Sequence, residues 1–346
     1  MINGIQQMGI GTTDVHKSFK WYRRNFGFDV PVFDEAAEAP LMTQYTGGTV
    51  HARHAILAMN LNGGGGMEIW QFTSRRSADQ HPFSLLRNGL LVTKIKCQNA
   101  ELGHQSVENN ATSAVSTDPA GMKCFSVTDP FGNPFIASET NNWYQKKGSQ
   151  FGGIEGAIIG VSDMEKSLKF YREVLEIDTI VYDTESVFED LNGLADGDKK
   201  FRRVRLEPSN RNTGAFSEVF GAFHIELLQP VNDESGKHNL GGRFWGDQGY
   251  IHLCFDVNQM DGIKQRAAEM GNAFTIDSGD SFNMGEAAGR FAYLEDPDGS
   301  LIELVETDKI TVSKKLNWLL TLSQKRKKKP LPRWLFSVMA FNRVKD

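Results

Sequence analysis

The alternation of apolar and polar residues predicts strands and amphipathic helices at matching places in the two halves of the chain. Apolar runs over Ile5–Thr12 and Gly156–Ser162 predict strands. Each run is followed by an Asp, Asp14 or Asp163, of the type that caps the start of a helix. Behind these caps, apolar residues recur at spacings of three and four, which predicts one buried helical face in each half. These residues are Phe19, Tyr22 and Phe26 in the first half, and Leu168, Tyr171 and Leu175 in the second.

Three longer motifs repeat in the same order in both halves and predict a tandem duplication. The joint falls near Lys146–Gly153, a stretch rich in Gly, Lys and Ser as linkers are. The matching pairs are Asp14–Arg24 with Asp163–Glu173, Met67–Gln71 with Ile225–Gln229, and Asp129–Asn133 with Asp296–Ser300.

Each half divides once more into two similar modules. Gly89–Cys97 and Gly249–Val257 predict further strands, and Asp261–Gly271 predicts a helix. Hairpins over Phe125–Ser138 and Phe291–Val305 turn at Asp-Pro-x-Gly, where Pro and Gly favour a tight turn. The chain therefore contains four predicted βαβββ modules.

Four such modules, with an Asp-Pro-x-Gly turn before an Ile-Glu-Leu strand, resemble the vicinal oxygen chelate superfamily. This family includes glyoxalase I, bleomycin-resistance proteins and extradiol dioxygenases, and the resemblance covers about residues 1–307. It implies an α+β fold of tandem glyoxalase-like domains, each made of two paired βαβββ modules that form a cupped mixed sheet. The expected domains are residues 1–145 and 153–307, followed by a basic C-terminal extension over 308–346.

In that family, inward residues on the first and last strands of each module hold a divalent metal. By this resemblance the positions in the second half are Gly156, Glu226, His252 and Glu303. A carboxylate in an apolar strand is costly to bury without a partner, so the last three are a candidate metal set. An oxygen, nitrogen and oxygen set suits Zn, Mn, Fe, Ni or Co.

The corresponding positions of the first half are Gln7, Glu68, Val92 and Ile136. Val92 and Ile136 cannot bind a metal, although Gln occurs at the first position in some glyoxalases. We therefore expect the N-terminal domain to be without metal and to serve as structure or as a substrate wall.

Substrate contacts are predicted for His224, Phe223, Trp245 and Arg290, the last as an anion clamp. His224 shares a strand face with Glu226, and with His252 and Glu303 it would give the two-His, one-carboxylate set of non-haem iron oxygenases. It does not occupy the family's ligand position, so a pocket role is the preferred interpretation. No glutathione-binding pattern is readable in the sequence, so no thiol cofactor is inferred.

The resemblance implies a metal-dependent lyase or isomerase acting on a small substrate with vicinal oxygens, with Glu226 or Glu303 moving a proton. Two alternatives stay open. One is a metal-free binding protein of the resistance type, and the other is an extradiol-type dioxygenase. Gly156 stands against the dioxygenase, because the family's iron enzymes have His at that position.

The amino-acid composition indicates the cellular compartment and a surface that could bind a partner. Three cysteines without a Cys-x-x-Cys motif favour a reducing cytoplasm, and no secretory signal or apolar span is expected. Residues 309–346 hold eleven Lys or Arg and one Asp, a charge of +10, which leaves −15 for residues 1–308. This extension is expected to pack on the acidic body or to dock on an anionic membrane surface. A small-molecule substrate is the expected partner, a homodimer is left open, and nucleic acid is not expected.

Overall fold

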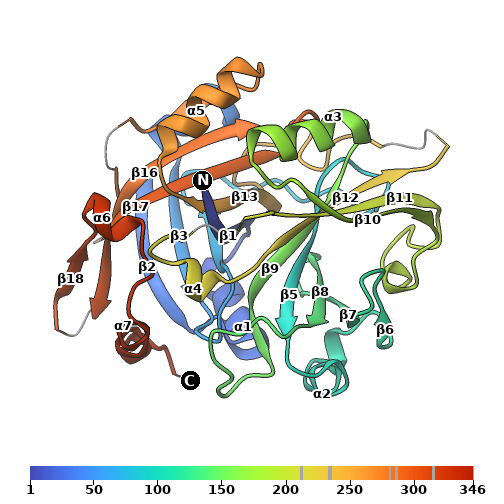
Figure 1. The fold of residues 1–346 in the computed structure, drawn as a ribbon, viewed down its shortest axis with the longest axis horizontal. Helices are drawn as coiled ribbons and strands as arrows, with labels where there is room; N and C mark the ends of the chain where they lie inside the picture. The colour runs from blue at the N-terminus through green and yellow to red at the C-terminus, as the bar shows by residue number, and fades with distance from the viewer. Residues whose placement is uncertain (211–212, 233–235, 280–281, 285–286, 314–315, 346) are drawn as a thin grey trace.

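Two strongly curved mixed sheets form the centre of the molecule, and short helices cover their outer faces (Figure 1). The computed structural model describes residues 1–345 except 211–212, 233–235, 280–281, 285–286 and 314–315. The predicted α+β class and the cupped sheets built from paired modules are confirmed. Among the described helices, none is both long and apolar enough to span a membrane.

Within the described residues, sheet A has ten strands and sheet B has eight. The strands of sheet A are β1 (Ile2–Gly11), β2 (Val30–Glu38), β3 (Ala52–Met59), β4 (Gly66–Phe72), β13 (Gly249–Val257), β14 (Ile276–Asp277), β15 (Phe282–Met284), β16 (Ala287–Glu295), β17 (Leu301–Ser313) and β18 (Trp318–Thr321). The strands of sheet B are β5 (Gly89–Cys97), β6 (Ser116–Thr117), β7 (Lys123–Thr128), β8 (Pro134–Glu139), β9 (Phe151–Gly160), β10 (Thr179–Ser186), β11 (Phe201–Glu207) and β12 (His224–Pro230).

The strand order shows which modules share a sheet. Sheet A runs β14-β16-β17-β13-β1-β4-β3-β2, so it joins the first module to the fourth through an antiparallel β1–β13 pair. Sheet B runs β10-β11-β12-β9-β5-β8-β7-β6 and joins the second module to the third through β5 and β9. This corrects the expectation that consecutive modules of one half pair with each other. Residues 1–145 and 153–307 each contribute one module to both sheets.

Helices begin where the sequence predicts a cap. The Asp14 carboxylate accepts a hydrogen bond from the Lys17 backbone N–H at 2.9 Å, and Asp163 caps its helix in the same way. The helices are α1 (Val15–Phe26), α2 (Ala100–Ser106), α3 (Met164–Lys169), α4 (Ser217–Phe220), α5 (Met260–Glu269), α6 (Gln324–Lys327) and α7 (Arg333–Met339). Helical segments of other types, 3-10 or π, are η1 (Pro40–Tyr45), η2 (Glu108–Asn110), η3 (Phe170–Val174), η4 (Glu189–Leu191) and η5 (Ala340–Asn342).

The main core lies between helices α1, α2, α3 and α5 and the outer faces of both sheets. The predicted apolar face of α1 is buried there, with Tyr22 and Phe26 fully inaccessible to solvent. Tyr22 donates a hydrogen bond to Asp129 of the first Asp-Pro-x-Gly turn at 2.5 Å, and Tyr171 donates to Asp296 of the second at 2.9 Å. Each sequence half is therefore tied together by a helix-to-turn bond, while each sheet ties the two halves to each other.

Candidate metal centre

Four polar side chains meet on the concave face of sheet A, where β17, β13, β1 and β4 lie next to one another. Gln7 comes from β1, Glu68 from β4, His252 from β13 and Glu303 from β17. The register brings them level, because Gly9 of β1 pairs with both Glu68 and His252. Gly9 is required here, since a Cβ atom at this position would overlap the imidazole ring of His252. We call these four side chains the sheet A cluster.

The donor atoms of the sheet A cluster converge closely. His252 Nε2 lies 3.1 Å from Glu68 Oε2 and 3.2 Å from Glu303 Oε2. Gln7 Nε2 donates hydrogen bonds to the same two carboxylate oxygens, at 2.9 and 3.3 Å. All four residues are buried, with side chains drawn from strands up to 296 residues apart.

This arrangement fits a divalent metal ion. Ligands at about 2.1 Å from one ion and at right angles to each other lie about 3.0 Å apart, close to the observed separations around His252. His252 Nε2 is buried without a well-formed hydrogen bond, and so is Gln7 Oε1. Turning the Gln7 amide over would add a neutral oxygen ligand, because its oxygen and nitrogen are interchangeable in shape. Glu68, His252 and Glu303 could then hold the ion together with Gln7.

Aromatic groups position the histidine. The Trp245 ring lies nearly parallel to the His252 ring, with centroids 6.1 Å apart. The Tyr293 hydroxyl lies 3.4 Å from His252 Nδ1, the ring nitrogen that faces away from the carboxylates. A partner on this nitrogen fixes the tautomer and orientation of a metal-binding histidine.

Charge and burial shift the ionisation of the cluster. Burial raises the pKa of Glu303, and the neighbouring Glu68 raises it further against the lowering effect of His252. For His252, burial alone would lower the pKa, but Glu303 and Glu68 outweigh it and the pKa is raised. Within the described chain, no Lys or Arg forms an ion pair with Glu68 or Glu303. The cluster is therefore a buried site with an excess of negative charge.

A pocket opens onto the cluster from the side of η1. Glu68 and Glu303 lie in its wall together with Arg53, Trp70, Trp245 and Tyr293. Arg53 is held by Glu35, with Nη2 to Oε1 at 2.9 Å. Farther along the same concave face lies a second, mostly apolar pocket between Leu57, Val305 and the α7 residues Phe336 and Met339.

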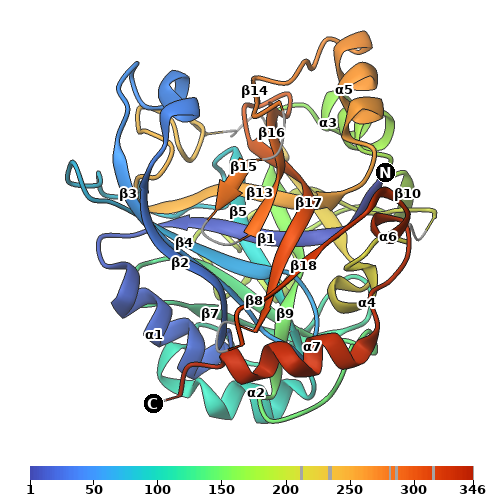
Figure 2. The same ribbon diagram turned by 90° about the vertical axis from the view of Figure 1, so that its left-hand side faces the viewer.

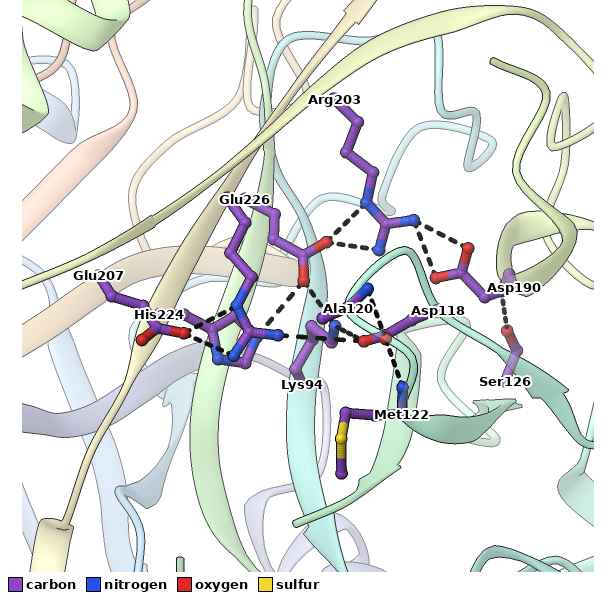
Figure 3. A network of polar contacts seen from close by, with 11 residues as sticks. Lys94, Asp118, Ala120, Met122, Ser126, Asp190, Arg203, Glu207, His224 and Glu226 are labelled. Carbon is purple, nitrogen blue, oxygen red and sulfur yellow. Dashed lines mark hydrogen bonds and ion pairs between the residues drawn. The ribbon is translucent and has the colours of Figure 1, made fainter. Parts of the chain in front are cut away.

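Glu226, predicted as a metal ligand and catalytic residue, lies in sheet B. Its carboxylate contacts Lys94 Nζ at 2.5 Å and Arg203 Nε at 2.6 Å (Figure 3). Arg203 Nη1 also donates to both oxygens of Asp190 at 2.8 Å. Lys94 reaches Asp118 at 3.3 Å, and Arg205 Nη1 lies 4.0 Å from the same carboxylate, so three cations face three carboxylates. We call these groups, with Arg205 beside Asp118, the sheet B network.

The predicted set of Glu226, His252 and Glu303 is thus not brought together as a whole. The structure unites His252 and Glu303 with Glu68 and Gln7, because the first module, not the third, pairs with the fourth. Burial would raise the pKa of Glu226, but Arg203 and Lys94 outweigh it and hold that pKa well below its usual range. The positions equivalent to the remaining ligands in sheet B are Gly156, Val92 and Ile136, as counted from the sequence.

The four predicted substrate residues fall in different places. Trp245 lines the pocket of the sheet A cluster. His224 lies in sheet B, with Nε2 3.4 Å from Glu226, and burial lowers its pKa to about 3. Phe223 packs in the core against Phe255. Arg290 forms ion pairs at 2.7 Å with Asp277 and Asp261, and it is not among the residues that line the described pockets.

Two residues of the cluster, Gln7 and Glu68, occupy the first-strand and last-strand positions of the first module, in the half that is expected from the sequence to be metal-free. The missing information was the pairing of modules. The sequence carries one indication that the second module pairs with the third. Lys94 of the second module and Arg203 of the third lie on apolar strands, and a buried Glu226 needs their positive charge nearby.

Comparison with known proteins agrees with this architecture. Residues 153–304 match the family model of the Glyoxalase/Bleomycin resistance protein/Dioxygenase superfamily. The crystal structure of glyoxalase I from Zea mays is similar, with 14% identity, a TM-score of 0.54, and coverage of 88% of this chain and 92% of that chain. A candidate dioxygenase from Bacillus subtilis has 13% identity and a TM-score of 0.58, over 99% of this chain and 97% of that chain.

No curated protein sequence matches the chain significantly. At these identities, the two solved structures show a common fold and no more. Residues 153–304 are therefore similar to the Glyoxalase/Bleomycin resistance protein/Dioxygenase superfamily, and the chain shares the fold of glyoxalase I over most of its length.

Proposed function

We propose that this protein is a metal-dependent lyase or isomerase of the glyoxalase type, acting on a small substrate with two adjacent oxygens. The observation that carries the proposal is the convergence of Glu68, His252 and Glu303, with Gln7 beside them, next to a pocket that Glu68 and Glu303 line. This set contains Glu68 where the resemblance implies Glu226.

The chain's own residues would share the chemistry. A divalent ion held by this oxygen- and nitrogen-rich set would act as a Lewis acid on the two substrate oxygens. Glu68 and Glu303 both face the pocket, so either carboxylate is placed to take or return a proton at the carbon next to those oxygens. Trp70 and Trp245 would exclude water from the reacting atoms.

Elemental analysis by mass spectrometry tests the site directly. Protein purified without chelator should contain close to one divalent ion per chain, and Glu68→Ala, His252→Ala and Glu303→Ala should each lose it. The matched control is Glu226→Gln, which removes a charge at the equivalent strand position of sheet B and should leave the metal content unchanged. Absence of metal after reconstitution with Zn, Mn, Fe, Co or Ni would contradict the proposal.

One observation favours the metal-free binding protein as a second candidate. Gln7 Nε2 bridges Glu68 and Glu303 by hydrogen bonds, which would hold two carboxylates together without an ion. The same metal analysis separates the two functions. The dioxygenase hypothesis is disfavoured because His252 is the one histidine of the described cluster, whereas non-haem iron oxygenases use two. Ferrous-dependent oxygen uptake with a catechol would favour that hypothesis again.

A further inference from the structure

The C-terminal extension is a folded part of the molecule that lies outside the four modules. β18 adds to the end of β17, and α6 and α7 follow along the same face, the one turned toward the viewer in Figure 2. The inner side of α7 is well packed, since Leu335, Phe336 and Met339 are no more than 4% exposed. The extension is therefore fixed in place, and its outer surface has a defined composition.

That outer surface is unusually apolar. Trp334 is 56% exposed and Phe341, seven residues later on the same side of the helical segment, is 69% exposed. Among the exposed large apolar side chains of the described chain, these two are the aromatic ones. Leu316 and Leu319 of the β18 hairpin are 74% and 38% exposed, and Trp318 stacks on Trp334 with ring centroids 5.9 Å apart. The stack joins the hairpin and the helix into one surface.

Between β18 and α7 the chain carries a run of positive charge around α6. Lys327 is buried and paired with Glu306 and Asp308, which anchors α6 to the acidic body. Its neighbours Lys325, Arg326, Lys328 and Lys329 point to solvent, and the described residues give them no ion pair. The acidic body therefore neutralises one residue of the basic run and leaves four free.

We propose that this surface of exposed Leu316, Leu319, Trp334 and Phe341 with the four free cations docks on an anionic membrane surface. Amphipathic segments that bind in the headgroup region combine Trp, Phe and Leu with Lys and Arg in this way. The cations attract anionic lipid headgroups, and the aromatic rings enter the interface. Nucleic acid would use the charge but would leave the two leucines in water, so lipid is the better fit.

Docking in this orientation has a consequence for the pocket. Phe336 and Met339, on the inner side of the same α7, line the apolar pocket beside the sheet A cluster. Membrane contact through the outer side of α7 would bring that pocket to the lipid interface. The consequence for the pocket rests on the proposed function of the sheet A cluster, whereas the docking of the C-terminal extension on a membrane does not.

Vesicle sedimentation of the full-length protein tests the docking. The protein should sediment with phosphatidylcholine vesicles that contain about 30 mol% phosphatidylserine and should not sediment with pure phosphatidylcholine. Binding should weaken by at least about tenfold in about 0.5 M NaCl, because the attraction is electrostatic. Trp334→Ser with Phe341→Ser, and separately Lys328→Gln with Lys329→Gln, should each weaken it by about tenfold.

A control variant carries the same types of change at a distant surface, Val187→Ser with Lys199→Gln and Lys200→Gln, and should bind as the wild type does. Unchanged melting curves and metal content would show that the variants are folded. Absence of binding to the anionic vesicles at low salt would overturn the proposal. So would binding to duplex DNA that outcompetes the vesicles, or a dimer seen by light scattering that Trp334→Ser abolishes.

Discussion

Sheets A and B have the same architecture but hold their central glutamates in opposite ways. Glu68 and Glu226 occupy equivalent positions, on the last strand of the first and third modules. Glu226 is surrounded by Lys94 and Arg203, and the sheet B network balances three carboxylates with three cations. Glu68 has Gln7, His252 and a second carboxylate, Glu303, as neighbours.

The difference shows two ways in which a curved sheet can hold a buried glutamate. A buried carboxylate needs a cation, because the cost of removing an ion from water is several kcal/mol. Sheet B supplies the cation from its own side chains, and apolar residues such as Phe188 and Leu191 fill the space around it. In the described part of sheet A, no Lys or Arg neutralises Glu68 and Glu303, and a pocket lies beside them. We therefore expect sheet B to be structural and sheet A to be functional.

The largest effect is expected from breaking the sheet B network. Arg203→Met removes a fully buried cation and leaves Glu226 and Asp190 undercompensated, which should lower the free energy of unfolding by about 3–5 kcal/mol. The neighbouring Arg202 is a matched control, because its ion pairs with Asp183 and Glu165 lie at the surface, so Arg202→Met should cost less than about 1 kcal/mol. Guanidinium denaturation measures both, and equal losses would show that the network is not the stabilising element.

A pH-dependent effect is expected in sheet A, where Asp256 on β13 is buried. Burial raises its pKa from 3.8 to about 7, with Glu306 adding to the rise and Asn3 and Lys327 opposing it. Since the folded state holds the proton more tightly, the stability that Asp256 contributes is complete below about pH 4 and is lost as pH rises through 7. Asp256→Asn should therefore stabilise the protein at pH 8, by an upper limit of about 4 kcal/mol, and change little at pH 4.

Thermal unfolding across this pH range measures the effect. A stabilisation by Asp256→Asn that is the same at pH 4 and pH 8 would show that Asp256 is ionised throughout. Loss of stability at both pH values would indicate that its hydrogen bond from Asn3 matters more than its charge.

The smallest effect on stability is expected for Glu68→Gln, and its sign should be opposite to that of Glu226→Gln. In chelator-treated protein, Glu68→Gln removes a charge beside Glu303 and should stabilise the fold by about 1 kcal/mol, whereas Glu226→Gln should destabilise it. With excess Zn or Mn, Glu68→Gln should instead melt below the wild type, because the wild type gains stability from metal binding and the variant does not. Melting temperatures with and without metal measure this, and the same sign for both variants in chelator would refute the comparison.

Most of the fold follows from local sequence patterns. The Asp caps, the apolar face of α1 and the Asp-Pro-x-Gly turns act within a few residues, and the structure has each of them where the sequence predicts it. Each of the four candidate ligand positions in sheet A was also found by counting within a module. These features depend on neighbours in sequence, so one chain suffices to find them.

The grouping of those positions did not follow from local patterns. The first strands of the four modules, β1, β5, β9 and β13, are all apolar, and each leaves one edge free within its module. Short stretches of sequence therefore do not show whether the first module pairs with the second or with the fourth. The choice depends on contacts over the whole chain and on the path between the halves. For this reason the sequence alone groups Glu226 with His252, although Lys94 and Arg203 neutralise its charge in the structure.

The pairing of the first module with the fourth also sets the order in which the chain can fold. Sheet B pairs β5 with β9, which are close in sequence, but the edge of β1 that does not pair with β4 has no partner until β13 exists. At about 5–20 residues per second, synthesis from β4 to the end of β17 takes tens of seconds. During this interval the apolar edge of the first module is exposed to chaperones and to other nascent chains. Sheet A is then completed last, when Glu303 arrives beside Gln7.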